Sequence, residues 1–364
     1  MEQGPDHLNF KLSSAGEVIY VTSPDSVIID SVIFDQQTPD VSYGRYPNYT
    51  GSWDIMSVPT PGGINLPHDT TEYSPDAIVY PESGFYDNPI NVTLYSDHSD
   101  VEIFYTLDGS VPDTNSFQYT EPLLFVQTTV IRLITIRSGF QPSLVQTHNF
   151  IFDSDFNLPT MALTVNPSVF PIGGGEYNVH VAYFKQDGSL GFACDAGIER
   201  HGSSSPQNPY RISFKPEYGP TYVNYPIFEN RENHIYKRLI LRNASNDRFP
   251  KINNDNRAHL RDGIIQTLYE RIWPDGGFSA FKSIHVYING TYWGIYHLRE
   301  RQDRHYVEEL FGYEDIDLLE RAFGYVNNKN AIEGDWMAYD SLEYFVENED
   351  MTQEINFQYL KDNI

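Results

Sequence analysis

Residues 284–303 read IHVYINGTYWGIYHLRERQD, and this stretch decides how the last part of the chain folds. Apolar and polar residues alternate on both sides of Asn289 and Gly290, as they do in strands with one buried face. Asn-Gly between two such runs is the strongest short-range signal for a tight hairpin, because both residues accept the backbone of its turn. The sequence therefore predicts two paired strands, with Glu300 and Asp303 at the end of the second.

Helical patterns lie on both sides of this hairpin. Residues 258–273 place apolar side chains at the spacing of one helical face, and Pro274 stops the pattern. The apolar positions are Leu260, Ile264, Ile265, Leu268 and Ile272. A second helix is predicted over residues 303–312. Residues 158–364 are therefore expected to form a domain that mixes strands with helices.

Two β-rich blocks precede this domain. The first, residues 1–66, ends in the run 59–65, which is too rich in Pro and Gly for a central strand. After a polar linker, residues 77–153 alternate again around an Asp-Gly turn at Asp108. Asp108 and Asp113 could offer oxygens to a calcium ion, although aspartates in turns more commonly cap backbone amides. The sequence predicts two small all-β immunoglobulin-like sandwiches.

The composition allows packed domains and narrows the range of partners. Apolar residues make up 40% of the 364 residues, and the formal net charge is -26. This charge repels nucleic acids and anionic lipid surfaces. The single Cys194 excludes an intramolecular disulfide and a cysteine-bound zinc ion. No apolar run reaches the roughly 18 residues of a membrane span, and residues 1–10 lack the apolar core of a secretion signal, so we expect any export signal to be missing or to lie upstream.

One candidate site is a small-residue loop that leads into a strand. Residues 198–206 read IERHGSSSP, and residues 210–215 read YRISFK. Backbone amides of such a loop can face phosphate oxygens, while Arg211 or Lys215 can pair with them from the strand. A Gly-Ser turn between strands is more commonly only a turn, so this pattern alone is a weak signal.

A second candidate lies where a strand meets a helix. Residues 238–247 form an apolar strand that ends in a polar cluster with Arg242, and residues 260–262 begin the predicted helix. Asp262 either belongs to a site at this junction or complements the positive end of the helix dipole. Both interpretations remain open from the sequence.

The motifs "LILRN..ND", "LRD" and "VYING.Y.GIYHLRE..D", in this order, resemble the CotH family of spore-coat and surface kinases. The resemblance spans residues 158–364. It implies a divergent protein-kinase-like α+β fold that binds ATP with Mg²⁺ and phosphorylates Ser or Thr hydroxyls of a protein. The residues that it implies for nucleotide binding are Gly202, Ser203, Ser204, Arg211, Lys215, Arg242 and Glu300, with 298–300 touching adenine.

This chain departs from the family pattern in two respects. The family's Lys-Lys pair before the strand is replaced by Gln207 and Asn208, and we expect Arg211 to compensate because arginine binds phosphate bidentately. The family's catalytic and metal-binding aspartates follow a long insertion. We expect them beyond residue 364, so the domain is predicted to be C-terminally incomplete and the chain inactive by itself.

The two earlier blocks also resemble known domains. Residues 77–153 carry "P.SG.Y", "I.YTLDGS.P" and "T.IR....G..PS", similar to the β-sandwich appended to chitobiase and other hexosaminidases. Residues 1–66 carry "SYGR", a Trp and "PTPG..N", similar to the later strands of a lamin-tail domain. This arrangement implies an extracellular or surface-associated bacterial protein. Its expected partners are a protein substrate and a polysaccharide or cell-surface contact, without nucleic acid or a membrane span.

Other function classes fit the sequence less well. A serine hydrolase is disfavoured because no G-x-S-x-G elbow accompanies His201 and the neighbouring serines. A zinc hydrolase is disfavoured because the 11 histidines are scattered. The remaining rival is a non-enzymatic surface protein in which the kinase-like domain serves as a scaffold. The presence of the metal-binding and catalytic aspartates in the full-length gene would separate these two.

Overall fold

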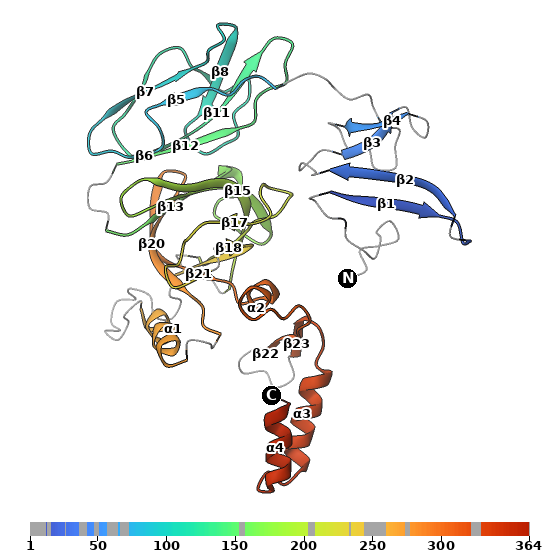
Figure 1. The fold of residues 1–364 in the computed structure, drawn as a ribbon. Helices are drawn as coiled ribbons and strands as arrows, with labels where there is room; N and C mark the ends of the chain where they lie inside the picture. The colour runs from blue at the N-terminus through green and yellow to red at the C-terminus, as the bar shows by residue number, and fades with distance from the viewer. Residues whose placement is uncertain are drawn as a thin grey trace.

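The computed structural model describes residues 12, 16–25, 27–35, 42–46, 51–56, 65, 73–152, 157–202, 208–232, 234–243, 260–273, 277–321 and 329–363. Within these residues the chain is mostly β, and Figure 1 shows a β-sandwich, a barrel and a pair of helices near the C-terminus. No helix among these ranges is long and apolar enough to cross a membrane.

The first segment forms two antiparallel hairpins. Strand β1 (Gly16–Thr22) pairs with β2 (Ile28–Asp35), and β3 (Ser42–Tyr46) pairs with β4 (Ser52–Met56). Arg45 lies 4.9 Å from the ring of Trp53 and forms an ion pair with Asp30 at 2.7 Å. The predicted hairpins are present, and a lamin-tail sandwich at this end stays a prediction.

The second segment is a β-sandwich. Its strands are β5 (Ile78–Tyr80), β6 (Gly84–Phe85), β7 (Ile90–Tyr95), β8 (Val101–Thr106), β9 (Phe117–Gln118), β10 (Leu123–Phe125), β11 (Thr129–Arg137) and β12 (Gln146–Ile151). The order is β10-β7-β5 in one sheet and β6-β12-β11-β8-β9 in the other. Val92, Leu94, Ile131, Leu133 and Phe150 fill the core between them. The predicted sandwich is confirmed.

The turn aspartates of the sandwich act as caps. Asp108 accepts the backbone N–H of Ser110 at 2.9 Å, and Asp113 accepts that of Asn115 at 2.8 Å. Hydrogen bonds from the hydroxyl and the backbone N–H of Ser110 hold the pKa of Asp108 below its usual value, and bonds from the backbone and side-chain N–H groups of Asn115 do the same for the pKa of Asp113. The capping interpretation of these residues explains their geometry without a calcium ion.

The third segment is built around a closed barrel. Its strands are β13 (Thr160–Val165), β14 (Glu176–Phe184), β15 (Leu190–Arg200), β16 (Tyr210–Ser213), β19 (Arg238–Arg242), β21 (Thr291–Glu300) and β20 (Phe281–Ile288), in that order around the barrel. A short helix η1 (Pro167–Val169) and the ribbon β17 (Val223–Asn224) and β18 (Ile235–Tyr236) complete it. Ile198, Ile212, Leu239, Ile284 and Leu298 belong to the buried core, so apolar side chains fill the barrel interior.

The predicted hairpin joins β20 to β21. Asn289 and Gly290 adopt positive φ angles of 48° and 76°, as the Asn-Gly signal predicts. The Asn289 side chain accepts the backbone N–H of Val165 and donates to its carbonyl oxygen, both at 2.9 Å. This residue therefore ties the hairpin to β13, whose pairing with β20 is parallel.

The helices lie outside the barrel (Figure 1). They are α1 (Arg261–Ile272), α2 (Arg304–Phe311), α3 (Met337–Asn348) and α4 (Glu354–Asp362), with a ribbon of β22 (Leu318–Arg321) and β23 (Lys329–Glu333) between α2 and α3. Helix α1 contacts the barrel through Gly263, where an added Cβ would lie 2.5 Å from the Phe281 ring. Its predicted apolar face stays exposed at Ile264, Ile265 and Leu268. A kinase-like arrangement of this segment remains a prediction.

The sandwich packs directly on the barrel. Phe85 and Ile151 contact a cluster that includes Ala182, Phe184 and Tyr287. The rings of Phe85 and Phe184 meet edge to face with centroids 5.6 Å apart. The β6–β12 edge of the sandwich therefore covers the side of the barrel formed by β13, β14 and β20.

Candidate functional site

The side of the barrel away from the sandwich carries charge. In the strand register, Glu199 lies opposite Arg211, Arg211 opposite Ile240, and Ile240 opposite Arg299. These four positions therefore form one row across β15, β16, β19 and β21. Their chain neighbours Ile198, Ile212 and Leu239 belong to the core. Because side chains alternate along strands, this row lies on the outer face of the barrel.

Arg211 sits within a group of charges on this face. It forms an ion pair with Glu199, and Lys215 forms one with Glu176 at 2.5 Å. Burial lowers the pKa of Arg211, and the positive charges of Arg301 and Arg238 lower it further. Three guanidinium groups therefore lie close enough to repel one another, which favours an anion among them.

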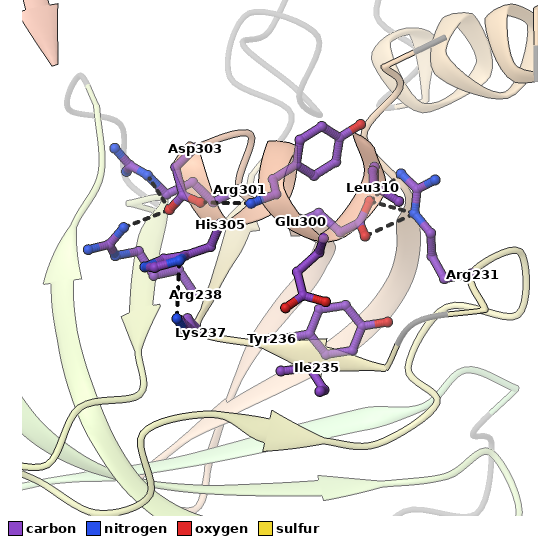
Figure 2. Close-up of a pocket in the computed structure, with 12 residues that line it drawn as sticks. Arg231, Ile235, Tyr236, Lys237, Arg238, Glu300, Arg301, Asp303, His305 and Leu310 are labelled. Carbon is purple, nitrogen blue, oxygen red and sulfur yellow. Dashed lines mark hydrogen bonds and ion pairs between the residues drawn. The ribbon is translucent and has the colours of Figure 1, made fainter. Parts of the chain in front are cut away.

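Arg238 and Arg301 share one carboxylate. Asp303 lies 2.7 Å from Arg238 and 3.5 Å from Arg301, and it also caps α2 by accepting the N–H of Tyr306 at 3.3 Å. Figure 2 shows these charges side by side. The capping explains why the sequence places this aspartate directly before the helix.

Asp262, at the start of α1, forms ion pairs with two arginines of the barrel strands. It forms an ion pair with Arg299 and another, at 3.1 Å, with Arg242. Arg299 is buried, and this burial lowers its pKa. Arg242 is about half exposed, so solutes can reach its guanidinium. Asp262 fits both interpretations made from the sequence. It lies in the first turn of α1, where it complements the helix dipole, and it also belongs to a charged cluster.

Glu300 lies apart from these arginines, in a buried ion pair with Arg231. The two side chains are 9% and 7% exposed, and their shortest distance is 2.5 Å. Glu300 also accepts the backbone N–H of Ala280 at 2.9 Å, and Arg231 donates to the carbonyl of Phe278 at 2.6 Å. Its chain neighbours Arg299 and Arg301 form ion pairs with Asp262 and Asp303 on the outer face. Glu300 pairs with Arg231 instead, and these two residues are called the clamp below (Figure 2).

Two hollows adjoin the charged face. A small one of about 40 Å³, lined by Tyr236, Arg238 and Glu300 among others, is far below the roughly 300 Å³ that small-molecule sites need. A larger one of about 550 Å³ lies beside α1 and is lined in part by Gln266 and Phe281. Phe281 is the register partner of Arg299, so the larger hollow borders the Asp262 cluster.

The structure brings some of the predicted site residues together. Arg211 and Arg242 lie on the same face of adjacent strands. Lys215 lies near them, because its ion-pair partner Glu176 is the register partner of Glu199 in the charged row. Gly202 follows β15 with a φ of 88°, a conformation that glycine adopts readily. Ser203 and Ser204 lie outside the described residues.

Sequence reasoning did not assign a role to Arg238, Arg301 or Asp303, the last of which was only placed at a strand end. Arg299 was expected only within the segment 298–300 that touches adenine, and not as a partner of Asp262. The available signals were the alternation of charged and apolar residues in RLILR and the run of three charges after Leu298 in LRER. In the described part of the chain no group of three or more His, Cys, Asp or Glu side chains is arranged to hold a metal ion.

Comparison with known families agrees with the two main domains. Residues 198–364 match the family model described as CotH kinase protein, and residues 81–147 match the one described as chitobiase/beta-hexosaminidase C-terminal domain. A search of curated proteins found no match. Residues 198–364, from the end of β15 through α4, are therefore CotH-like, and a chitobiase-type sandwich precedes the barrel.

Proposed function

We propose that this CotH-like protein binds ATP beside α1, with the phosphates against Arg242 and the neighbouring cations, and serves phosphoryl transfer to Ser or Thr hydroxyls of a protein. We place it at the bacterial cell surface or outside the cell. This location rests on the arrangement that the resemblance implies, in which a chitobiase-type sandwich precedes the barrel.

The observation that carries the proposal is the bridge from Asp262 to Arg242 and Arg299. Protein kinases hold a strand cation with a carboxylate from the neighbouring helix, and that cation binds the nucleotide phosphates. Here α1 supplies the carboxylate, while β19 and β21 supply arginines. Arginine keeps its charge and can donate two parallel hydrogen bonds to a phosphate.

The two arginines have different roles in this scheme. Arg299 is buried and holds Asp262 in place, whereas half-exposed Arg242 can turn toward an incoming phosphate. Arg211, Arg238 and Arg301 extend the positive field along the same face. These residues therefore bind and orient the anion.

The cationic side chains of this face can donate hydrogen bonds to the ATP phosphates. Cations outnumber carboxylates here, although the whole chain is strongly acidic. The 550 Å³ hollow beside α1 lies within the size range of nucleotide-type pockets. ATP supplies the transferred group, and a divalent metal neutralises its charge. We assign no residue to the metal or to the hydroxyl proton.

Calorimetry of ATP binding with the full chain tests the proposal. We expect Arg242→Ala to weaken binding by about 1.5–3 kcal/mol, the scale of one charge-assisted hydrogen bond. Arg137→Ala is the matched control, because Arg137 also pairs with an aspartate, Asp100, but on the distant sandwich. Equal affinities of the wild type and Arg242→Ala would place the nucleotide elsewhere.

A second candidate is a non-enzymatic surface protein with a kinase-like scaffold. It is favoured by the carboxylate partners of Arg211, Arg238 and Arg242, since structural ion-pair networks look the same as binding sites by this criterion. The same calorimetry separates the two, because a scaffold has no reason to retain ATP.

A further inference from the structure

The three-stranded sheet of the sandwich exposes an uncharged face. On β5, β7 and β10 the buried residues Val79, Val92, Leu94 and Phe125 point into the core. The alternate residues therefore point outward. They are Ile78, Tyr80, Asn91, Thr93, Tyr95 and Leu124, called the tyrosine face below.

Strand register places two tyrosines next to each other on this face. Tyr80 pairs with Thr93, and Ile78 pairs with Tyr95, so Tyr80 and Tyr95 are diagonal neighbours. Residues in this relation lie about 7–8 Å apart, within reach of aromatic side chains. Their exposed fractions are 66% and 47%. The Thr93 hydroxyl donates to the carbonyl of Tyr80 at 3.1 Å and fixes the backbone beneath the rings.

The charge of this face argues for a neutral ligand. None of its six residues is ionisable at neutral pH, although the chain has 50 acidic and 24 basic residues. An anionic polymer would find no cation here and would be repelled by the net charge of -26. A cationic partner would find no carboxylate on the face. Asn91, Thr93 and the tyrosine hydroxyls provide hydrogen bonding instead.

The size of the face argues against a folded protein partner. Strand β7 has six residues, and its neighbours lie one strand spacing away on each side. With a rise of about 3.3 Å per residue and a spacing of about 4.8 Å, the face covers roughly 200–300 Å². Stable protein interfaces bury about 800 Å² on each partner. A narrow extended chain fits this face better.

The barrel leaves the tyrosine face free. The barrel approaches the sandwich at Phe85 on β6, Ile151 on β12 and the start of β11, which all belong to the other sheet, and at Gly109. Figure 1 shows β6 and β12 next to the barrel. A ligand on β5 and β7 therefore does not compete with domain packing.

We propose that the tyrosine face binds a single strand of a neutral polysaccharide. The rings of Tyr80 and Tyr95 pack against the apolar faces of successive sugars, while Asn91 and the tyrosine hydroxyls bond to sugar hydroxyls. The inference is independent of the proposed phosphoryl transfer, since it concerns another domain.

Retention of the full chain on insoluble polysaccharides tests this inference. The probes are cellulose and chitin as neutral polymers and alginate beads as the anionic control. We expect retention on at least one neutral polymer and none on alginate. Tyr80→Ala and Tyr95→Ala should each weaken that retention about tenfold, the factor equivalent to 1.4 kcal/mol. Tyr344→Ala, which removes an equally exposed ring from α3, should leave it unchanged.

Three results would overturn the inference. The first is no retention of the wild type on either neutral polymer. The second is retention that Tyr80→Ala and Tyr95→Ala leave unchanged while their melting temperatures match the wild type. The third is self-association in sedimentation runs that depends on Tyr80 and occurs without glycan binding, which would make a second copy the occupant.

Discussion

The buried pair of Arg231 and Glu300 allows the sharpest test, because the structure and the sequence assign Glu300 different roles. Replacing Glu300 by Ala removes the partner of a guanidinium that is 7% exposed and the acceptor of the Ala280 N–H. Removing one partner of a buried ion pair costs about 3–5 kcal/mol, since the remaining charge stays desolvated. A domain of this size then melts roughly 6–20 °C lower.

Thermal unfolding followed by circular dichroism measures this loss. Glu229→Ala is the matched control, because Glu229 is 90% exposed in its ion pair with Lys282, and such pairs contribute at most about 1 kcal/mol. Replacing both partners, Arg231→Met with Glu300→Leu, should recover much of the stability, as apolar groups of similar volume leave no buried charge.

One outcome would refute this reasoning. If Glu300→Ala melts within about 2 °C of the wild type and yet loses ATP binding, Glu300 contacts the nucleotide as the sequence suggested, and the clamp is not what holds the end of β21. A large loss of stability in the single variant with recovery in the double variant supports the clamp.

Two further predictions concern His148 and Asp303. Burial and the nearby His180 lower the pKa of His148 from 6.5 to about 4, so the unfolded chain takes up this proton first and stability should fall as pH drops from about 6.5 to about 4. His148→Gln should flatten that part of a denaturant-unfolding series across pH, and an unchanged slope would contradict the assignment. Both Asp303→Ala and Asp303→Asn remove the ion pairs with Arg238 and Arg301, but only Asp303→Ala also removes the cap of α2, so it should be less stable than Asp303→Asn by about 1–2 kcal/mol; equal melting temperatures for these two variants would contradict the capping role.

Local features of this protein were predictable from the sequence. The Asn289-Gly290 hairpin follows from the backbone preferences of two adjacent residues. Helix α2 has Asp303 as its cap and Gly312 at a φ of 73° after its last turn, close to the predicted bounds of 303–312. The sandwich strands were readable because alternation and turn residues lie within a few positions of each other.

The candidate site was only partly predictable. Arg211 and Arg242 were expected, and they do lie on one face, but the sequence did not show that Asp262 pairs with Arg242 and Arg299. Glu300 was expected near a nucleotide because the family resemblance implied it. Its partner Arg231 comes from a loop almost seventy positions away, a pairing that no local pattern encodes.

The sequence by itself determined the hairpins, the helix ends and the acidity of the chain, since these depend on neighbouring residues or on composition. Only the tertiary structure decided the closure of the barrel, in which β13 pairs in parallel with β20 more than a hundred residues later. Closure sets which strands are neighbours, and strand register then decides which charges meet. Alternation in one strand tells that a side chain points outward, but not what lies beside it.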